Sequence, residues 1–170
     1  SIKLFDVLSD ACLDLLHSGQ VEMAFTAAIV NPQEFNTHFL FGDPFVVACH
    51  KSHVLASSKS LTIEDLAGEN IIRFPVGSSL RQYLDQLLQS LPATGVGHLE
   101  IVGGIATAAA LVASDCGIAV ITKLNSFYFQ RPEICCIPLD NLNLVRNIYV
   151  VTRKGRTLSS AGAGFLDLIN

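Results

Sequence analysis

A chain of 170 residues is long enough to form one large domain or two small ones around a substantial hydrophobic core. Half of its residues are hydrophobic and 15% are charged, yet no stretch approaches the roughly 18 to 20 unbroken apolar residues of a membrane helix, so we expect no membrane contact. The net charge of −4, with no basic run, zinc-finger spacing or recognisable signal peptide, argues against a nucleic-acid-binding surface in these residues.

The cysteines indicate the redox compartment. There are five of them, an odd number, and none forms a CxxC motif. They are Cys12, Cys49, Cys116, Cys135 and Cys136. This usage predicts buried free thiols and a cytoplasmic location, where thiols stay reduced. Cys135 and Cys136 are neighbours in a predicted strand, so their side chains should point to opposite faces.

The first fifty residues alternate apolar runs with turn residues. They predict strands over residues 1–5, 21–25, 39–41 and 45–49, with Gly42–Asp43–Pro44 separating the last two. A helix between the first two strands is expected to be capped by Ser9 or Asp6 and stopped by Gly19.

The same alternation continues to the end of the chain. It predicts strands over 71–74, 99–102, 118–121, 134–139 and 147–152, and helices over 80–91, 105–114 and 123–129. Thr62 is expected to cap a short helix, and Ser159 a last helix that runs to Ile169. Strands alternating with helices predict an α/β fold.

Residues 99–121 form the most informative unit, a strand, a helix of small residues and a second strand. Gly103 and Gly104 stand where the helix begins. Backbone N–H groups at a helix start can bind an anion or a carbonyl oxygen, and glycine leaves them unshielded. The two glycines suit a plain tight turn as well, so both interpretations stay open. The second strand lacks polar alternation, which is typical of a strand covered on both faces, as in a parallel sheet.

The other reactive residues lack the partners that catalysis or metal binding requires. His50 and His53 lie beside Cys49 with no carboxylate near in sequence, which favours surface or hinge histidines over a metal site. Ser78 and Ser79 have no local base, which favours capping or ligand binding over nucleophilic attack. With no GxSxG, HExxH, P-loop or GxGxxG motif, we predict no enzyme activity, no metal and no cofactor.

Several segments, in this order, resemble the C-terminal effector-binding domain of LysR-type bacterial transcriptional regulators. They are LLHSGQVEMAF at 15–25, FVVACHKSHVLASSKSLTIEDLAGENIIRF at 45–74, DCGIAVI at 115–121, IPL at 137–139 and NIYVVTRKG at 147–155. Three positions depart from the family pattern: Glu22 stands where Asp is usual, and Val54 and Thr122 each replace a Pro. The match starts at what resembles the family's second strand, so the first strand, the first helix and the DNA-binding domain fall outside it.

The resemblance implies an α/β fold of the periplasmic-binding-protein-like type II class, with an effector in the cleft between two subdomains joined by two crossing strands. We expect the crossings near 47–51 and 143–147. Subdomain one would then be 1–48 plus 146–170, and subdomain two 49–145. Ligands in such folds bind at the carboxyl ends of strands, where helices begin. Applied to the predicted strands, this rule selects Thr26, Ala27, Ala28, Gly77, Ser78, Ser79, Arg81, Gly103, Gly104 and Ile105.

The family resemblance also implies the function, a ligand-sensing domain of a transcription regulator. Bare N–H donors, the hydroxyls of Thr26, Ser78 and Ser79, and one nearby cation favour a small carboxylate or other anion as effector. Arg81 is equally compatible with a solvated position in the first helical turn. The resemblance implies a homodimer or higher oligomer, and DNA contact only through the absent N-terminal domain. The alternative is a transporter's solute-binding protein or an enzyme of the same fold.

Overall fold

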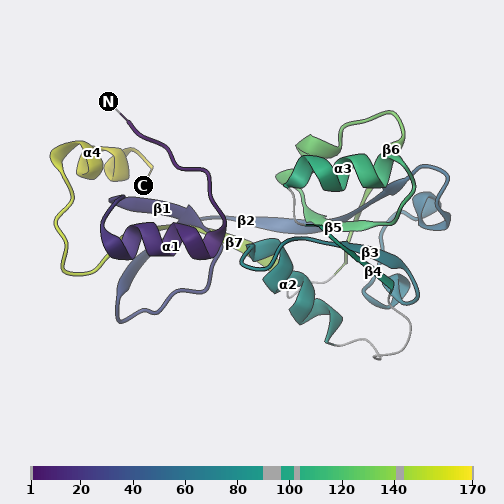
Figure 1. The fold of residues 1–170 in the computed structure, drawn as a ribbon, viewed down its shortest axis with the longest axis horizontal. Helices are drawn as coiled ribbons and strands as arrows, with labels where there is room; N and C mark the ends of the chain where they lie inside the picture. The colour runs from purple at the N-terminus through teal and green to yellow at the C-terminus, as the bar shows by residue number, and fades with distance from the viewer. Residues whose placement is uncertain (1, 90–96, 102–103, 141–143, 170) are drawn as a thin grey trace. The chain divides into compact units, whose positions relative to one another are not determined.

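The computed structural model describes residues 2–89, 97–101, 104–140 and 144–169 (Figure 1). In chain order the elements are α1 (Ser9–Ser18), β1 (Met23–Thr26), β2 (Phe35–His50), η1 (Val54–Ser57), η2 (Glu64–Leu66), β3 (Asn70–Arg73), α2 (Ser79–Leu88), β4 (Gly97–Glu100), α3 (Ile105–Ala113), β5 (Ala119–Thr122), η3 (Asn125–Phe129), β6 (Ile134–Pro138), β7 (Val145–Arg153) and α4 (Ser160–Leu168), with η marking short 3₁₀ helices. This confirms the predicted α/β fold class. Within the described residues, no helix combines the length and the apolar character that a bilayer crossing demands.

The chain divides into two compact units. Unit 1 comprises residues 1–42 and 147–170, and unit 2 comprises residues 43–146. The chain passes from unit 1 to unit 2 inside β2 and returns inside β7. The predicted boundaries, 48/49 and 145/146, lie six residues after the first of these divisions and one residue before the second.

Unit 1 is built on a small sheet in which β1 pairs antiparallel with β7, which neighbours β2. Helix α1 ends as predicted at Gly19, whose φ of 74° and backbone N–H bonds to two helix carbonyls complete the C-terminal turn. Helix α4 begins as predicted at Ser159, whose hydroxyl accepts from the Gly162 N–H. The core of the unit is small: Leu16, Ala24, Phe35 and Val151 form its buried cluster.

Two predictions for unit 1 are wrong. Residues 2–8 form no strand, because a strand needs a hydrogen-bonding neighbour and none of the described strands pairs with this segment. Neither Ser9 nor Asp6 caps α1. Ser9 lies inside the helix, and Leu8 takes the cap position without a side-chain hydrogen bond.

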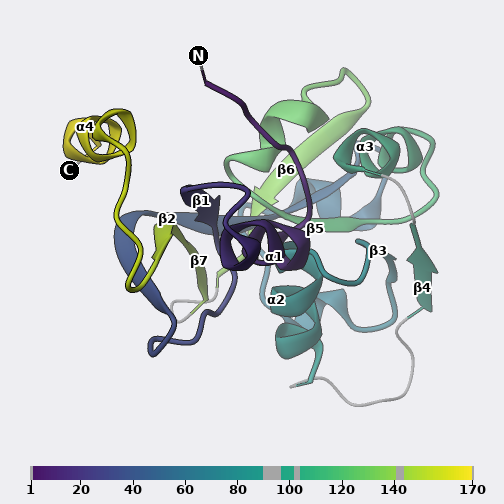
Figure 2. The same cartoon turned by 60° about the vertical axis from the view of Figure 1, so that its left-hand side comes forward.

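In unit 2, β5 and β6 pair with β2, and β3 and β4 form a separate two-stranded sheet. Strands β3 and β4 are parallel, and an isolated parallel bridge joins Ile71 of β3 to Ile118 before β5. Strand β2 pairs antiparallel with both β5 and β6. All four residues of β5 are buried, as the lack of alternation predicted, although one of its neighbours is antiparallel. Helices α2 and α3 lie on either side of β5 (Figures 1 and 2).

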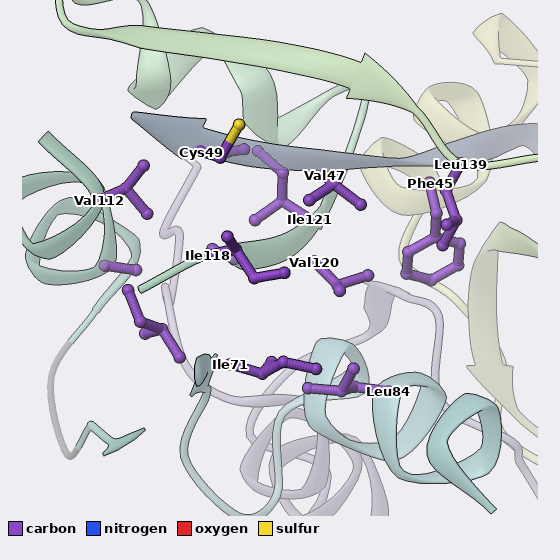
Figure 3. Packing of buried hydrophobic residues seen from close by; sticks show 14 of the residues in the cluster. Phe45, Val47, Cys49, Ile71, Leu84, Val112, Ile118, Val120, Ile121 and Leu139 are labelled. Carbon is purple, nitrogen blue, oxygen red and sulfur yellow. The ribbon is translucent and has the colours of Figure 1, made fainter. Parts of the chain in front are cut away.

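The side chains on these elements form one continuous core. Leu84 of α2 and Val112 of α3 point toward Ile71, Ile118 and Val120 (Figure 3). All of them are at most 1% exposed. Interiors of this kind are close-packed, which fixes the ends of the strands and the starts of the helices that follow them.

The predicted break at Gly42–Asp43–Pro44 is wrong, because β2 runs without interruption from Phe35 to His50. Proline lacks an N–H but can still accept, and the Pro44 carbonyl accepts from the Lys123 N–H at 2.8 Å. Asp43 is buried rather than exposed in a turn. The predicted turn is therefore a strand because tertiary partners on both sides satisfy its polar groups.

The remaining local differences are small. Helix α2 ends at Leu88, three residues before the predicted end. Thr62 does not cap a helix with its own oxygen: its N–H and hydroxyl both approach the Asp65 carboxylate, at 2.7 and 3.2 Å. All five cysteines are free, but the predicted burial holds fully only for Cys49, since Cys116 and Cys136 are exposed.

Candidate functional site

The candidate site lies at the carboxyl edge of the two-stranded sheet of β3 and β4 in unit 2. Strands β3 and β4 are parallel with Arg73 opposite Glu100, so they end at the same edge, and the Ile101 N–H donates to the Arg73 carbonyl there. Helix α2 begins shortly after β3 and helix α3 shortly after β4. The two helices that the sequence nominated separately therefore begin just beyond the same ends of these parallel strands.

The start of α2 is tightly organised. Gly77 has a φ of 86°, which other residues adopt with strain. Ser78 then caps the helix: its hydroxyl accepts from the Arg81 N–H at 3.2 Å and donates to the Pro75 carbonyl at 2.8 Å. Ser79 is buried. The Ser78 hydroxyl therefore serves as a helix cap. The sequence had favoured capping or ligand binding over a nucleophilic role for this residue.

The start of α3 is bare. Gly104 occupies the cap position with φ −82° and ψ −176°, and among the described residues no side-chain cap hydrogen bond is present. A methyl group built on Gly104 would meet no atom within 4 Å. Ile105, the first helical residue, is partly buried. Gly103, also a predicted site residue, lies outside the described residues.

Sequence reasoning missed a buried polar cluster at this edge, centred on Arg146. The Arg146 guanidinium donates to the Asp43 carboxylate at 2.8 Å, to the Asn125 side-chain oxygen at 3.3 Å and to the Ser79 hydroxyl at 3.4 Å. Asn125 in turn accepts from the Thr122 hydroxyl at 3.1 Å. Arg146 Nε is buried and has no hydrogen-bond partner within the part of the chain that the structure describes. The sequence signal that could have found this cluster is a single arginine, Arg146, in the predicted crossing segment 143–147.

Arg81 is engaged inside the chain. Its Nε donates to the Asp85 carboxylate at 2.8 Å and its Nη1 to the Phe74 carbonyl at 3.2 Å. Arg73 donates to the other oxygen of Asp85 at 3.0 Å, and its own Nε is buried with no hydrogen-bond partner among the described residues. Two guanidiniums therefore donate to the same carboxylate close to the start of α2.

The other predicted site residues belong to unit 1. Thr26, Ala27 and Ala28 follow one another at the end of β1 and are all buried. The Thr26 hydroxyl accepts from the Ala28 N–H at 3.0 Å, which holds the segment in a tight turn.

Unit 1 also contains a small pocket of about 210 Å³. It is lined by Gly19, Val21, Glu22, Arg153, Arg156, Thr157 and Leu158. Glu22, at the position where the family usually has Asp, uses its carboxylate to accept from the Ser159 N–H at 3.1 Å and from its hydroxyl at 2.8 Å. Glu22 therefore anchors the start of α4, and none of the predicted ligand residues lines this pocket.

The two histidines near Cys49 do not converge. His50 pairs with the Ser52 hydroxyl at 2.7 Å, whereas His53 contacts Glu69 at 3.2 Å and accepts from the Leu55 N–H. No group of three or more potential metal ligands occurs within the ranges that the structure describes.

Comparison with known proteins shows the family to which this chain is similar. The model of the LysR substrate binding domain matches residues 1–170. An uncharacterized HTH-type transcriptional regulator of Bacillus subtilis (strain 168), YybE, is 29% identical over 158 residues, which is 92% of this chain and 53% of that protein. The chain spans about half the length of the curated relatives it matches.

Solved structures show the same fold. The effector binding domain of QuiR in complex with shikimate superposes with a TM-score of 0.86 at 22% identity, covering 97% of this chain and 78% of that one. The regulatory domain of Synechocystis PCC6803 CcmR in complex with 2-PG gives 0.84 at 20% identity, covering 95% and 78%. The family match extends over the whole chain, and the structural likenesses confirm the periplasmic-binding-protein-like fold. This chain therefore belongs to the LysR substrate binding domain family.

Proposed function

We propose that this chain is the sensory part of a LysR-type transcription regulator and that its effector is a small carboxylate or similarly polar anion. The predicted ligand-binding residues of unit 2 are Gly77, Ser78, Ser79, Arg81, Gly103, Gly104 and Ile105, with Thr26, Ala27 and Ala28 of unit 1 as further contacts. The observation that carries the proposal is that two helices begin beyond the same ends of two parallel strands, with Arg73 and Arg81 near the start of α2.

The charge of that edge supports an anion. Arg73 and Arg81 both donate to the carboxylate of Asp85, so two guanidiniums lie near the start of α2 and favour the approach of a negative charge. A helix start favours a negative charge by roughly 0.3 to 1 kcal/mol when exposed and up to about 2 kcal/mol when partly buried. Two such starts and an arginine can together hold an effector at micromolar affinity, which corresponds to about −8 kcal/mol.

The related structure of QuiR supports the same chemical class, because shikimate is a carboxylate. An apolar side chain near the start of α2 suits the body of such a ligand, since Val76 is 78% exposed. We therefore expect a small organic anion rather than an inorganic one.

Gly104→Val is the direct test. The backbone of Gly104 is extended and an added Cβ atom meets no atom within 4 Å, so we expect the variant to fold normally while its branched side chain shields the N–H groups at the start of α3. Thermal denaturation with a panel of small carboxylates should show stabilisation of the unchanged chain and little or none of the variant.

The matched control is Gly164→Val in α4 of unit 1, another glycine where an added side chain meets open space. This variant should keep the full ligand-induced shift. The site assignment is wrong if Gly104→Val keeps the shift as well, and the choice of ligand class is wrong if no carboxylate stabilises the unchanged chain. Following the stabilising ligand by NMR separates sensing from the alternative of an enzyme, since a sensor returns the ligand unaltered.

The action of the whole regulator is also part of the proposal. We infer that DNA is bound by a region outside these 170 residues and that the regulator works as a homodimer or higher oligomer. Exposed apolar side chains in unit 1 support self-association, among them Ile29 at 80% and Phe39 at 57%. Light scattering should show association of this chain, and a gel shift at low salt should show no binding of promoter DNA by it; a stable monomer or salt-sensitive DNA binding would contradict these inferences.

A further inference from the structure

We propose that Cys49 and Cys135 form a redox-sensitive pair that a peroxide converts to a disulfide between β2 and β6. The two residues are 86 positions apart in sequence but directly opposite each other in the antiparallel register of the two strands. Their sulfur atoms lie 3.4 Å apart. Residues opposite each other on neighbouring strands point to the same face, so both thiols already face one another.

The register allows the bond. Along this ladder the Lys51 N–H donates to the Glu133 carbonyl and the Leu139 N–H to the Phe45 carbonyl. Hydrogen-bonded pairs alternate with non-bonded pairs in an antiparallel ladder, so Cys49 and Cys135 form a hydrogen-bonded pair with an expected Cα separation of about 5.5 Å. Disulfides span Cα distances of about 4.4 to 6.8 Å. Side-chain rotation, without a change of backbone pairing, is enough to bring the sulfurs together.

The neighbouring cysteines have no such partner. Cys136 follows Cys135 in β6 and is directly opposite Ala48, with its side chain on the other face of the sheet. Cys116 is exposed, and its sulfur lies 3.7 Å from the carbonyl of Ser114. Cys12 belongs to unit 1. Within the described structure, the pair on β2 and β6 is therefore the one prepared for an intramolecular bond.

The burial of the two thiols indicates which of them reacts first with the peroxide. Cys49 is fully buried (Figure 3), and burial, together with the contact to Cys135, raises the pKa of its thiol to about 12. Cys135 is only partly buried. We therefore assign the first attack to Cys135, because the thiolate is the reactive form and Cys49 hardly populates it at neutral pH.

The chemistry balances with hydrogen peroxide as oxidant. The Cys135 sulfur attacks one peroxide oxygen, the O–O bond breaks, and a sulfenic acid and one water form. The Cys49 sulfur then displaces the hydroxyl from Cys135 as its proton passes to the leaving oxygen, which gives the disulfide and a second water. Two thiols are oxidised by two electrons and one peroxide is reduced to two waters. A thiol reductant reverses the bond by exchange.

The test uses a Cys116→Ser/Cys136→Ser chain, which removes the two exposed thiols that could link molecules to each other. After treatment of the native protein with hydrogen peroxide, free thiols are alkylated under denaturing acid conditions and the peptides are mapped by mass spectrometry. We expect a cross-linked peptide pair containing Cys49 and Cys135, unmodified Cys12, and full recovery of both thiols with dithiothreitol. The same mapping of the unchanged chain should find the same link.

Two single variants serve as the test of the pair and as its control. Cys135→Ser should leave Cys49 quantitatively alkylated after peroxide, whereas Cys12→Ser, in unit 1, should leave the cross-link intact. The proposal is overturned if Cys49 stays free in the unchanged chain while the other cysteines are oxidised, or if the main disulfide joins Cys135 to Cys136. The mapping in the unchanged chain decides the question even if Cys135→Ser fails to fold.

Discussion

The two units use the same kinds of elements but bury them very differently. In unit 2 every residue of β5 is buried, and side chains of the helices on either side of it pack into one continuous core. In unit 1 the described core cluster consists of Leu16, Ala24, Phe35 and Val151, while apolar residues such as Ile29 and Leu168 are at least 80% exposed. An apolar pattern therefore forms strands and helices in both units, but only a sheet covered on both faces turns that pattern into a large core.

The difference extends to the charged groups. Unit 2 holds the buried ion pair of Asp43 and Arg146, whose side chains are 3% and 10% exposed. Unit 1 holds the contact of His17 with Glu34, whose side chains are 60% and 47% exposed. Water screens the second pair and hardly reaches the first, so the same kind of contact should matter far more in unit 2.

The largest expected effect follows from that contrast. Asp43→Ala leaves the Arg146 guanidinium buried without its carboxylate and takes an acceptor from the Leu124 N–H, so we expect a loss of about 3 to 5 kcal/mol in the free energy of unfolding. The matched change in unit 1, Glu34→Gln, should cost less than about 1 kcal/mol. Urea unfolding followed by circular dichroism measures both, and equal losses would break the comparison.

The next effect tests the cores themselves. Leu84 in α2 is fully buried, so Leu84→Ala should cost about 2 to 5 kcal/mol through lost contacts and a cavity. Leu168 in α4 is 84% exposed, so Leu168→Ala should change stability by no more than about 0.5 kcal/mol. Differential scanning calorimetry on both variants is the measurement; a large loss for Leu168→Ala would mean that unit 1 has a larger core than the comparison allows.

The smallest effect concerns the start of α4. Ser159→Ala removes the acceptor of the Gly162 N–H and the donor to Glu22, which should cost about 1 kcal/mol. The loss of stability should stay within unit 1, because α4 contributes little to the buried core. Hydrogen exchange should therefore speed up in α4 and remain unchanged in β5. Ser60→Ala, an exposed serine of unit 2, is the control, and equal acceleration in both units would contradict the local character of the effect.

Local sequence was enough for many elements of this chain. Residues a few positions apart predicted the helix stop at Gly19, the cap at Ser159 and the strand-helix-strand segment from β4 to β5. The order of several motifs along the chain predicted the family. The reason is physical: caps and periodicity depend on hydrogen bonds and faces that repeat within one or two turns of the chain. The same local signals identified Ser78 and Gly104 as helix starts.

Tertiary structure decided what local signals could not. The sequence 42–44 contains the residues of a turn, yet β2 continues through it because Arg146, 103 positions away from Asp43, and the Leu124 N–H satisfy the Asp43 carboxylate. Residues 2–8 have a strand-like composition but no partner strand among the described elements. The pairing of Cys49 with Cys135 likewise depends on the register of β2 and β6. Ion pairs, strand partners and facing thiols are contacts between distant segments, and only the folded chain determines which of them meet.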